Sequence, residues 1–123
     1  MKLDHLVLML GDLQASLPYY ETLLPLLGFT RTRAHDHVNE DGLHIELVQA
    51  GDPAHAYSRQ GVGLNHLGFA APDRATIDRI RDEMAAHGLP VPEIQRFGDD
   101  ASIFFKDRDG IRFEVSWTAP RRS

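Results

Sequence analysis

The sequence predicts an α+β fold made of two successive modules, each with the element order strand, helix, strand, strand, strand. The first observation is a repeated turn, since Asp41-Gly42 and Asp109-Gly110 are each followed by a run that alternates apolar and polar residues. Asp-Gly favours a tight turn, and alternation with a period of two is typical of a half-buried strand. The second observation is that a matching strand and helix precede each turn. The repeat therefore accounts for almost the whole chain.

The chain of 123 residues has the length of a single domain. We expect a first module over about residues 1–50, a linker over about 51–62 and a second module over about 63–118. The stretch from Ala50 to Gly63 is the predicted connection, because it is long, lacks periodicity and is rich in glycine.

In the first module, Leu3–Leu10 is predicted to be a strand that is apolar on both faces. A helix is expected from about Ser16 to Leu24, because Ser16 can cap it and proline is tolerated in a first turn. Pro25 should end or kink this helix, and Gly28 should close the segment. The other expected elements are a short strand at Phe29–Arg33, a third strand or a loop at Ala34–Glu40, and a strand at Leu43–Gln49.

The second module repeats this order. Its first predicted strand is Leu64–Ala70, which contains His66. Asp73 is the predicted cap of a helix that Gly88 ends. The remaining expected segments are strands at Glu93–Phe97 and Ala101–Lys106, a strand after Asp109-Gly110, and a frayed tail at Pro120-Arg121-Arg122-Ser123.

Composition and charge narrow the classes of partner. The formal net charge of -5 disfavours nonspecific binding to nucleic acid. No apolar run approaches the roughly 20 residues that a membrane span needs. Cysteine is absent, which excludes disulfides and thiolate metal ligands and fits a cytoplasmic protein. We therefore expect a small-molecule partner in the cytoplasm, with neither nucleic acid nor membrane.

Each predicted module places one histidine in its first strand and one glutamate in its last. A single histidine in a strand is usually structural, and a single glutamate on a polar face is usually solvated. The repetition at equivalent positions favours a shared role instead. Neutral imidazoles and carboxylates suit a divalent ion, whose charge two carboxylates would offset. If the modules pack with pseudo-two-fold symmetry, the four side chains converge. The sequence therefore predicts a metal site formed by His5, Glu46, His66 and Glu114.

Other polar residues are given different roles. His44 shares a face with Glu46 and could line the same cavity. Asp107 and Asp109 are expected to serve the turn before the last strand. Four histidines are expected to be surface residues of loops or helix ends: His35, His37, His55 and His87.

Several motifs carry a family resemblance. In the first half they are Asp4-His5-Leu6-Val7-Leu8, Asp12-Leu13, Ser16, Tyr19-Tyr20 and Leu27-Gly28-Phe29. In the second half they are Asn65-His66-Leu67-Gly68-Phe69 and the run Phe105–Glu114. On these motifs the chain resembles the vicinal oxygen chelate superfamily, also called the glyoxalase/bleomycin-resistance/dioxygenase superfamily, over almost its full length.

The resemblance implies a structure and a ligand set. Two βαβββ modules would form a cupped eight-stranded mixed sheet with the helices outside. His5, His66 and Glu114 match the family's metal ligands, and Glu46 matches a fourth ligand found in glyoxalase I relatives. The implied cofactor is one divalent metal ion per site, drawn from nickel, cobalt, zinc, manganese and iron.

The resemblance also implies a choice of functions. The first is a metal-dependent, glyoxalase-like lyase or isomerase acting on a small molecule with vicinal oxygens, with Glu114 or Glu46 as the catalytic base. The alternatives are an extradiol-type Fe(II) dioxygenase, for which His5, His66 and Glu114 form the iron site, and a non-catalytic protein that binds a drug or metabolite.

The first strand predicts an assembly. A strand that is apolar on both faces requires cover on both, and the chain's own helix covers one. We expect the second cover to come partly from another subunit, in a symmetric homodimer. In the resembling family, metal sites are often shared across a dimer, which here would pair His5 and Glu46 with His66 and Glu114 of the partner subunit. The alternative is a site built within one chain.

Overall fold

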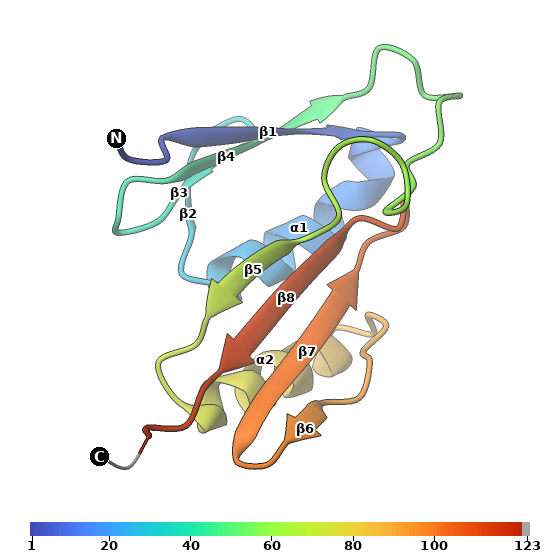
Figure 1. Cartoon of the computed structure of the whole chain (residues 1–123). Coiled ribbons are helices and arrows are strands. Elements are labelled where there is room, and N and C mark those ends of the chain that lie inside the picture. The colour runs from blue at the N-terminus through green and yellow to red at the C-terminus, as the bar shows by residue number, and fades with distance from the viewer. Residues whose placement is uncertain (122–123) are drawn as a thin grey trace. The chain divides into compact units, whose positions relative to one another are not determined.

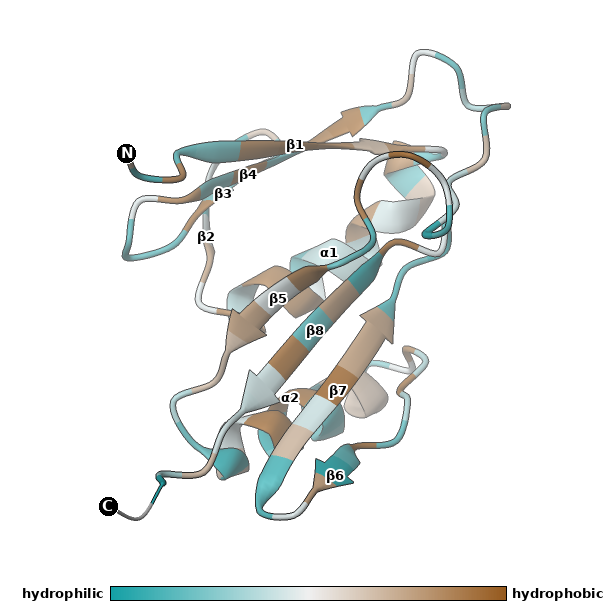
Figure 2. Ribbon diagram, in the orientation of Figure 1, coloured by the Kyte–Doolittle hydropathy of each residue, from teal (hydrophilic) through white to brown (hydrophobic). Residues whose placement is uncertain are grey.

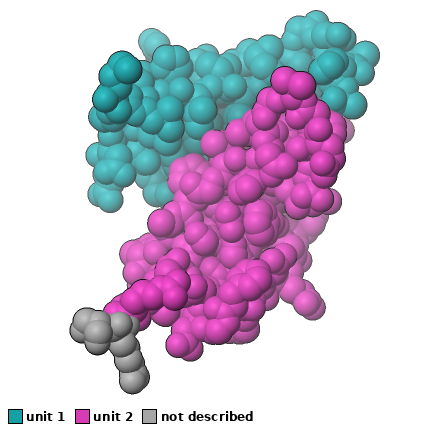
Figure 3. Space-filling view, viewed as in Figure 1, with its two compact units in different colours: residues 1–56 teal, residues 57–123 magenta. Residues whose placement is uncertain are grey.

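The computed structural model describes residues 1–121 of the chain. It divides into two compact units, and the division falls between Ala56 and Tyr57 in the sequence (Figure 3). This boundary falls inside the stretch predicted as a linker. The predicted tail at Pro120–Ser123 lies partly outside the described residues.

Unit 1 contains one helix and four strands (Figure 1). Its sheet has the strand order β1-β4-β3-β2, in which β1 and β4 run parallel and the other neighbours run antiparallel. The elements are β1 (His5–Leu10), α1 (Leu13–Leu26), β2 (Thr30–Arg33), β3 (Asp36–Val38) and β4 (His44–Gln49).

Unit 2 repeats this topology, with the strand order β5-β8-β7-β6 and a parallel pair formed by β5 and β8. Its elements are β5 (Leu67–Ala70), α2 (Arg74–Ala86), β6 (Gln95–Phe97), β7 (Asp100–Lys106) and β8 (Arg112–Trp117). The eight strands and two helices of residues 1–121 confirm the predicted α+β class and the two βαβββ modules. The strands form two four-stranded mixed sheets, one in each unit.

Each unit builds its core between its helix and one face of its sheet. In unit 2, Ile77, Ile80 and Met84 of α2 are fully buried with alternate residues of β7 and β8. Figure 2 shows the alternation along β8 as bands of hydrophobic and hydrophilic colour. The opposite face of each sheet carries polar residues of the same strands, together with a few apolar ones such as Val7, Met9 and Phe104. Within residues 1–121, no helix has the length and apolarity to cross a membrane.

The first helix begins earlier than the sequence predicts. Asp12 is its N-cap, because its side chain accepts a hydrogen bond from the Ala15 N–H at 3.1 Å. The hydroxyl of the expected cap, Ser16, is buried and donates to the Asp12 carbonyl instead, at 2.8 Å. Pro25 lies in the last turn without ending the helix there. The cap of the second helix is Asp73, as predicted.

His37 is buried, and the expectation that it is a surface residue is wrong. It is 2% exposed, because the alternation along β3 places it opposite Ile45 on the face that the helix covers. Its Nδ1 atom has no hydrogen-bond partner among the described residues. Burial lowers the pKa of His37 below its ordinary value of 6.5, so the imidazole is neutral in the folded unit near neutral pH.

The turn before the last strand has the same structure in both units. In unit 1 the Asn39 side-chain oxygen accepts the N–H groups of Asp41 and Leu43, at 3.1 and 2.9 Å. In unit 2 the carboxylate of Asp107 accepts those of Asp109 and Ile111, at 2.9 and 2.8 Å. The glycine of each turn has a positive φ, 83° and 92°. The structure thus confirms that Asp107 serves the turn.

This turn generates the first prediction. Asp107 is 6% exposed, so the substitution Asp107→Ala leaves two backbone N–H groups without their acceptor. We expect it to lower the free energy of unfolding by about 2 kcal/mol. Asp107→Asn keeps an oxygen acceptor, as Asn39 does in the other unit, and should stay close to wild type. Urea unfolding followed by the fluorescence of Trp117 measures both, and equal stability of the two variants would contradict the prediction.

Candidate metal site

The four residues predicted as metal ligands lie on the sheet faces that the helices leave uncovered. In unit 1, His5 begins β1 and Glu46 lies in β4. The parallel register places His5 opposite His44 and Val7 opposite Glu46, so these side chains project from the same face. In unit 2, His66 directly precedes β5 instead of lying within it.

Unit 1 brings its two predicted ligands into one recess. The recess has a volume of about 330 Å³. Its lining is uneven in charge, with three carboxyl groups, three imidazoles and a single guanidinium. His44 lines it together with Glu46, as predicted. The lining residues are Asp4, His5, Arg33, Ala34, His35, Asp36, His44 and Glu46.

Unit 2 brings its two predicted ligands into direct contact. The Nε2 atom of His66 lies 3.4 Å from Oε1 of Glu114. The second carboxylate oxygen accepts a hydrogen bond of 2.5 Å from the hydroxyl of Ser102, which is buried. Gly68 lies opposite Glu114 in the parallel pair, and a Cβ atom there would stand 3.6 Å from Oε1. Glu114 is therefore held on one side and bordered by a glycine on the other.

The residue before each histidine sets the tautomer of its imidazole. Nδ1 of His5 lies 2.7 Å from a carboxylate oxygen of Asp4, which can only accept, so Nδ1 carries the proton. Nδ1 of His66 lies 2.7 Å from Oδ1 of Asn65, and the side-chain amide N–H of Asn65 donates a hydrogen bond of 2.9 Å to the Arg59 carbonyl. In a neutral imidazole with this tautomer, Nε2 is the free acceptor, which is the form that binds a metal ion.

This tautomer makes the contact in unit 2 informative. Nε2 of a neutral His66 and Oε1 of Glu114 are both acceptors, and they face each other across 3.4 Å. Two lone-pair donors at this separation repel unless a proton or a cation lies with them. The chemistry of the pair therefore fits a divalent ion, for which imidazole and carboxylate are suitable ligands.

A further carboxylate orients His44 in the recess of unit 1. Asp36 accepts hydrogen bonds from His44 Nδ1 at 2.9 Å and from Thr32 at 2.8 Å. Burial alone would raise the pKa of Asp36, but these hydrogen bonds outweigh it and hold the pKa below its ordinary value of 3.8. The hydrogen bond from His5 likewise lowers the pKa of Asp4. Both carboxyl groups are therefore ionised at neutral pH.

The described structure divides the predicted ligands equally between the units. Among residues 1–121 no group of three or more histidine, aspartate and glutamate side chains stands in metal-binding geometry. Unit 1 supplies His5 and Glu46, and unit 2 supplies His66 and Glu114. Each unit thus provides half of the predicted set.

Sequence reasoning missed the residues that orient these side chains. Asp4 and Asn65 occupy the same position of the repeated motif, directly before each histidine, and that coincidence was a usable signal. Asp36 and Ser102 gave none, because their partners are distant in sequence and depend on strand register.

The tautomer assignment generates the second prediction. Proton–nitrogen correlation spectra of the imidazoles should show the Nδ1–H form for His5 and His66 in the metal-free protein. Asp4→Ala and Asn65→Ala should each return one histidine to the Nε2–H form that free imidazole prefers, leaving the other unchanged. His55, which is exposed and lies in a loop, serves as an internal reference. A majority Nε2–H form at His5 or His66 in the wild type would refute the assignment.

Comparison with known proteins agrees with this architecture. A family model of the glyoxalase/bleomycin resistance protein/dioxygenase superfamily matches residues 2–115. The uncharacterized protein YqjT of Bacillus subtilis is 29% identical over 123 aligned residues, covering 92% of this chain and 96% of that protein.

Two solved structures share the fold. A glyoxylase/bleomycin resistance protein/dioxygenase domain from Frankia sp. EAN1pec has a TM-score of 0.75 and 23% identity, covering 97% of this chain and 98% of that one. A fosfomycin resistance protein from Mesorhizobium loti has a TM-score of 0.70 and 20% identity, covering 96% of this chain and 92% of that one. The family model matches nearly the whole sequence, and the two βαβββ units agree with it. This chain therefore belongs to the glyoxalase/bleomycin resistance protein/dioxygenase superfamily.

Proposed function

We propose that this protein is a metal-dependent, glyoxalase-like lyase or isomerase that acts on a small molecule with two neighbouring oxygen atoms. The ligands are His5 and Glu46 from unit 1 and His66 and Glu114 from unit 2, and they bind one divalent ion. The observation that carries the proposal is the contact of 3.4 Å between His66 Nε2 and Glu114 Oε1, which are both acceptors when His66 is neutral. The matching tautomer of His5 supports it.

A bound divalent ion would supply Lewis acidity to the two substrate oxygens. The residues of this chain divide the remaining work. Ser102 holds the carboxylate of Glu114 in place, which suits a permanent ligand. Glu46 is exposed and has no hydrogen-bond partner in the described part of the chain, so its carboxylate would be free to move a proton at the substrate carbon. We therefore assign the role of catalytic base to Glu46 and that of fixed ligand to Glu114.

The freedom of Glu46 also fits a second candidate function. In an extradiol-type dioxygenase, His5, His66 and Glu114 alone would hold Fe(II) as a facial triad. Glu46 would then need no partner because it is not a ligand. The two candidates differ in metal, in the use of oxygen and in the role of Glu46. The third possibility, non-catalytic binding of a drug or metabolite, requires ligand binding that survives removal of the metal.

Metal analysis with a Glu46 variant is the third prediction. We expect about one divalent ion per chain in protein purified without chelator. The Glu114→Gln variant should lose that ion. Glu46→Gln should weaken metal affinity by roughly 10-fold to 100-fold or more, because that is the loss caused by removing a group that only orients a ligand, and Glu46 would be a charged ligand itself. Glu40→Gln, which removes an exposed carboxylate elsewhere in unit 1, is the matched control and should bind normally.

Turnover then separates the candidates. Hemithioacetal isomerisation is assayed with added nickel, cobalt, manganese or zinc, and oxygen uptake with catechols is assayed on iron-loaded protein. Absence of isomerisation with all four metals would remove the glyoxalase reading. Unchanged metal affinity in Glu46→Gln together with iron-dependent oxygen uptake would establish the dioxygenase instead. Metal-independent ligand binding without turnover would favour the binding protein.

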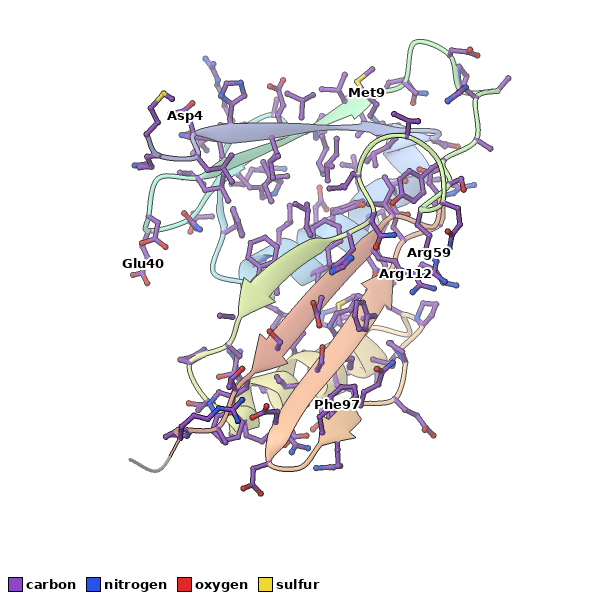
Figure 4. The ribbon with its side chains drawn as sticks, viewed as in Figure 1. Asp4, Met9, Glu40, Arg59, Phe97 and Arg112 are labelled. Carbon is purple, nitrogen blue, oxygen red and sulfur yellow. The ribbon has the colours of Figure 1, made fainter. Side chains whose placement is uncertain are left out.

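We also propose that the protein acts as a homodimer. Val7 and Met9 of β1 are 48% and 51% exposed, although both are apolar. Figure 4 shows Met9 projecting from the side of β1 opposite to α1. They share the uncovered face with His5, so a partner surface that covers them would also border the proposed ligands.

Assembly is the fourth prediction. Light scattering at micromolar concentration should give twice 13.8 kDa, whereas a mass near 13.8 kDa would rule out a stable dimer. Mixing His5→Ala with His66→Ala protein tests where the ligands come from. Sites shared between chains should regain a fraction of the metal binding in mixed dimers, and sites within one chain should regain none.

A further inference from the structure

The uncovered face of unit 2 contains a pair of like charges. Lys106 of β7 and Arg112 of β8 are directly opposite each other in the antiparallel register. Like charges at directly opposed positions destabilise a sheet. Among the described residues neither side chain has a hydrogen bond or an ion pair that would offset this repulsion. Arg112 is nevertheless half-buried, which desolvates its guanidinium in part.

The repeat in the structure shows that these charges are particular to unit 2. The equivalent opposed pair in unit 1 is Val38 and His44, and His44 is hydrogen-bonded to Asp36. In unit 2 the position of Asp36 is taken by Phe104, which lies opposite Glu114. At these positions unit 2 therefore has one carboxylate fewer than unit 1, and it has two cations on the same face.

The cationic pair borders the proposed metal ligands of the same unit. Arg112 lies two residues before Glu114 on one face of β8, a separation of about 7 Å along the strand. The ring of His66 packs edge-on against Phe104, with centroids 5.5 Å apart. A small molecule that lies against Phe104 and reaches Glu114 would bring an acidic group within range of both cations.

We propose that Lys106 and Arg112 bind an oxyanion group of the substrate, a carboxylate or a phosphate, and so restrict the substrates to acids that carry this group apart from the two chelating oxygens. The proposal rests on the proposed metal site. The planar guanidinium can grip an oxyanion through two hydrogen bonds, and the lysine supplies a second positive charge. The ligand would thereby relieve the repulsion between the two side chains.

A matched pair of chelators tests the proposal. One probe is succinic acid monohydroxamate, and the other is the same hydroxamate with its free carboxyl group replaced by a carboxamide. The two have the same length and the same metal-binding group, and they differ in one negative charge. Calorimetry on nickel-loaded protein should give about tenfold tighter binding of the acid, the gain expected of a charge-assisted pair. In Arg112→Gln this preference should fall to about twofold or less, and in Lys106→Gln it should fall in part, while affinity for the amide stays unchanged. Arg96→Gln removes the same charge from the opposite face of the sheet and should keep the full preference.

A second measurement does not need the metal. Inorganic phosphate should raise the thermal midpoint of wild-type apoprotein more than that of Arg112→Gln. A shift with phosphate but no preference for the carboxylate probe would identify phosphate as the group. If both hydroxamates bind with equal, metal-dependent affinity and phosphate has no effect, the cationic site is refuted while the metal site stands. If neither hydroxamate binds with nickel present, the metal site is refuted, and the phosphate shift then decides whether the cationic pair binds anions.

Discussion

The parallel pairing of the first and last strands within each unit is the constraint on which the rest of the structure depends. It places a histidine-bearing strand beside a glutamate-bearing strand in both units. The register is set where the last strand starts, at the turn that Asn39 or Asp107 stabilises. Because side chains alternate between faces, a shift of one residue at this turn would move the glutamate into the core. The turns therefore determine which face the glutamates occupy.

Much of the fold followed from the sequence, because its signals are local. Period-two alternation, the Asp-Gly turns and the cap at Asp73 all act within a few residues. The predictions that were wrong depended on competition or on long-range pairing. Asp12 and Ser16 can both cap a helix, and only packing decides that Ser16 is buried. The burial of His37 depends on the register of a three-residue strand that the sequence could not separate from a loop.

The sequence identifies the repeated residues of the candidate site, and their role as ligands stays a prediction. The equivalence of the two halves singled out two histidines and two glutamates. In each unit, the structure places one histidine and one glutamate on the sheet face that the helix leaves uncovered. Their orienting partners were visible only where they adjoin the histidines, as Asp4 and Asn65 do. Ser102 and Asp36 come from neighbouring strands. The two halves also differ in charge, since unit 1 has Asp36 where unit 2 has an aromatic ring, and it has no cation equivalent to Lys106 or Arg112 beyond the imidazole of His44.

The exposed apolar side chains of β1 have a consequence for folding. Each unit has about 60 residues and one helix on one sheet, a size at which burial alone gives only marginal stability. Unit 1 leaves Val7 and Met9 about half exposed, so part of its apolar surface gains nothing until another surface covers it. In the proposed homodimer, folding and association would be linked by mass action, and the resistance of the protein to denaturation should rise with its own concentration. In a cell that contains little of this protein, a given relative increase in its synthesis would then raise the amount of folded dimer by a larger factor.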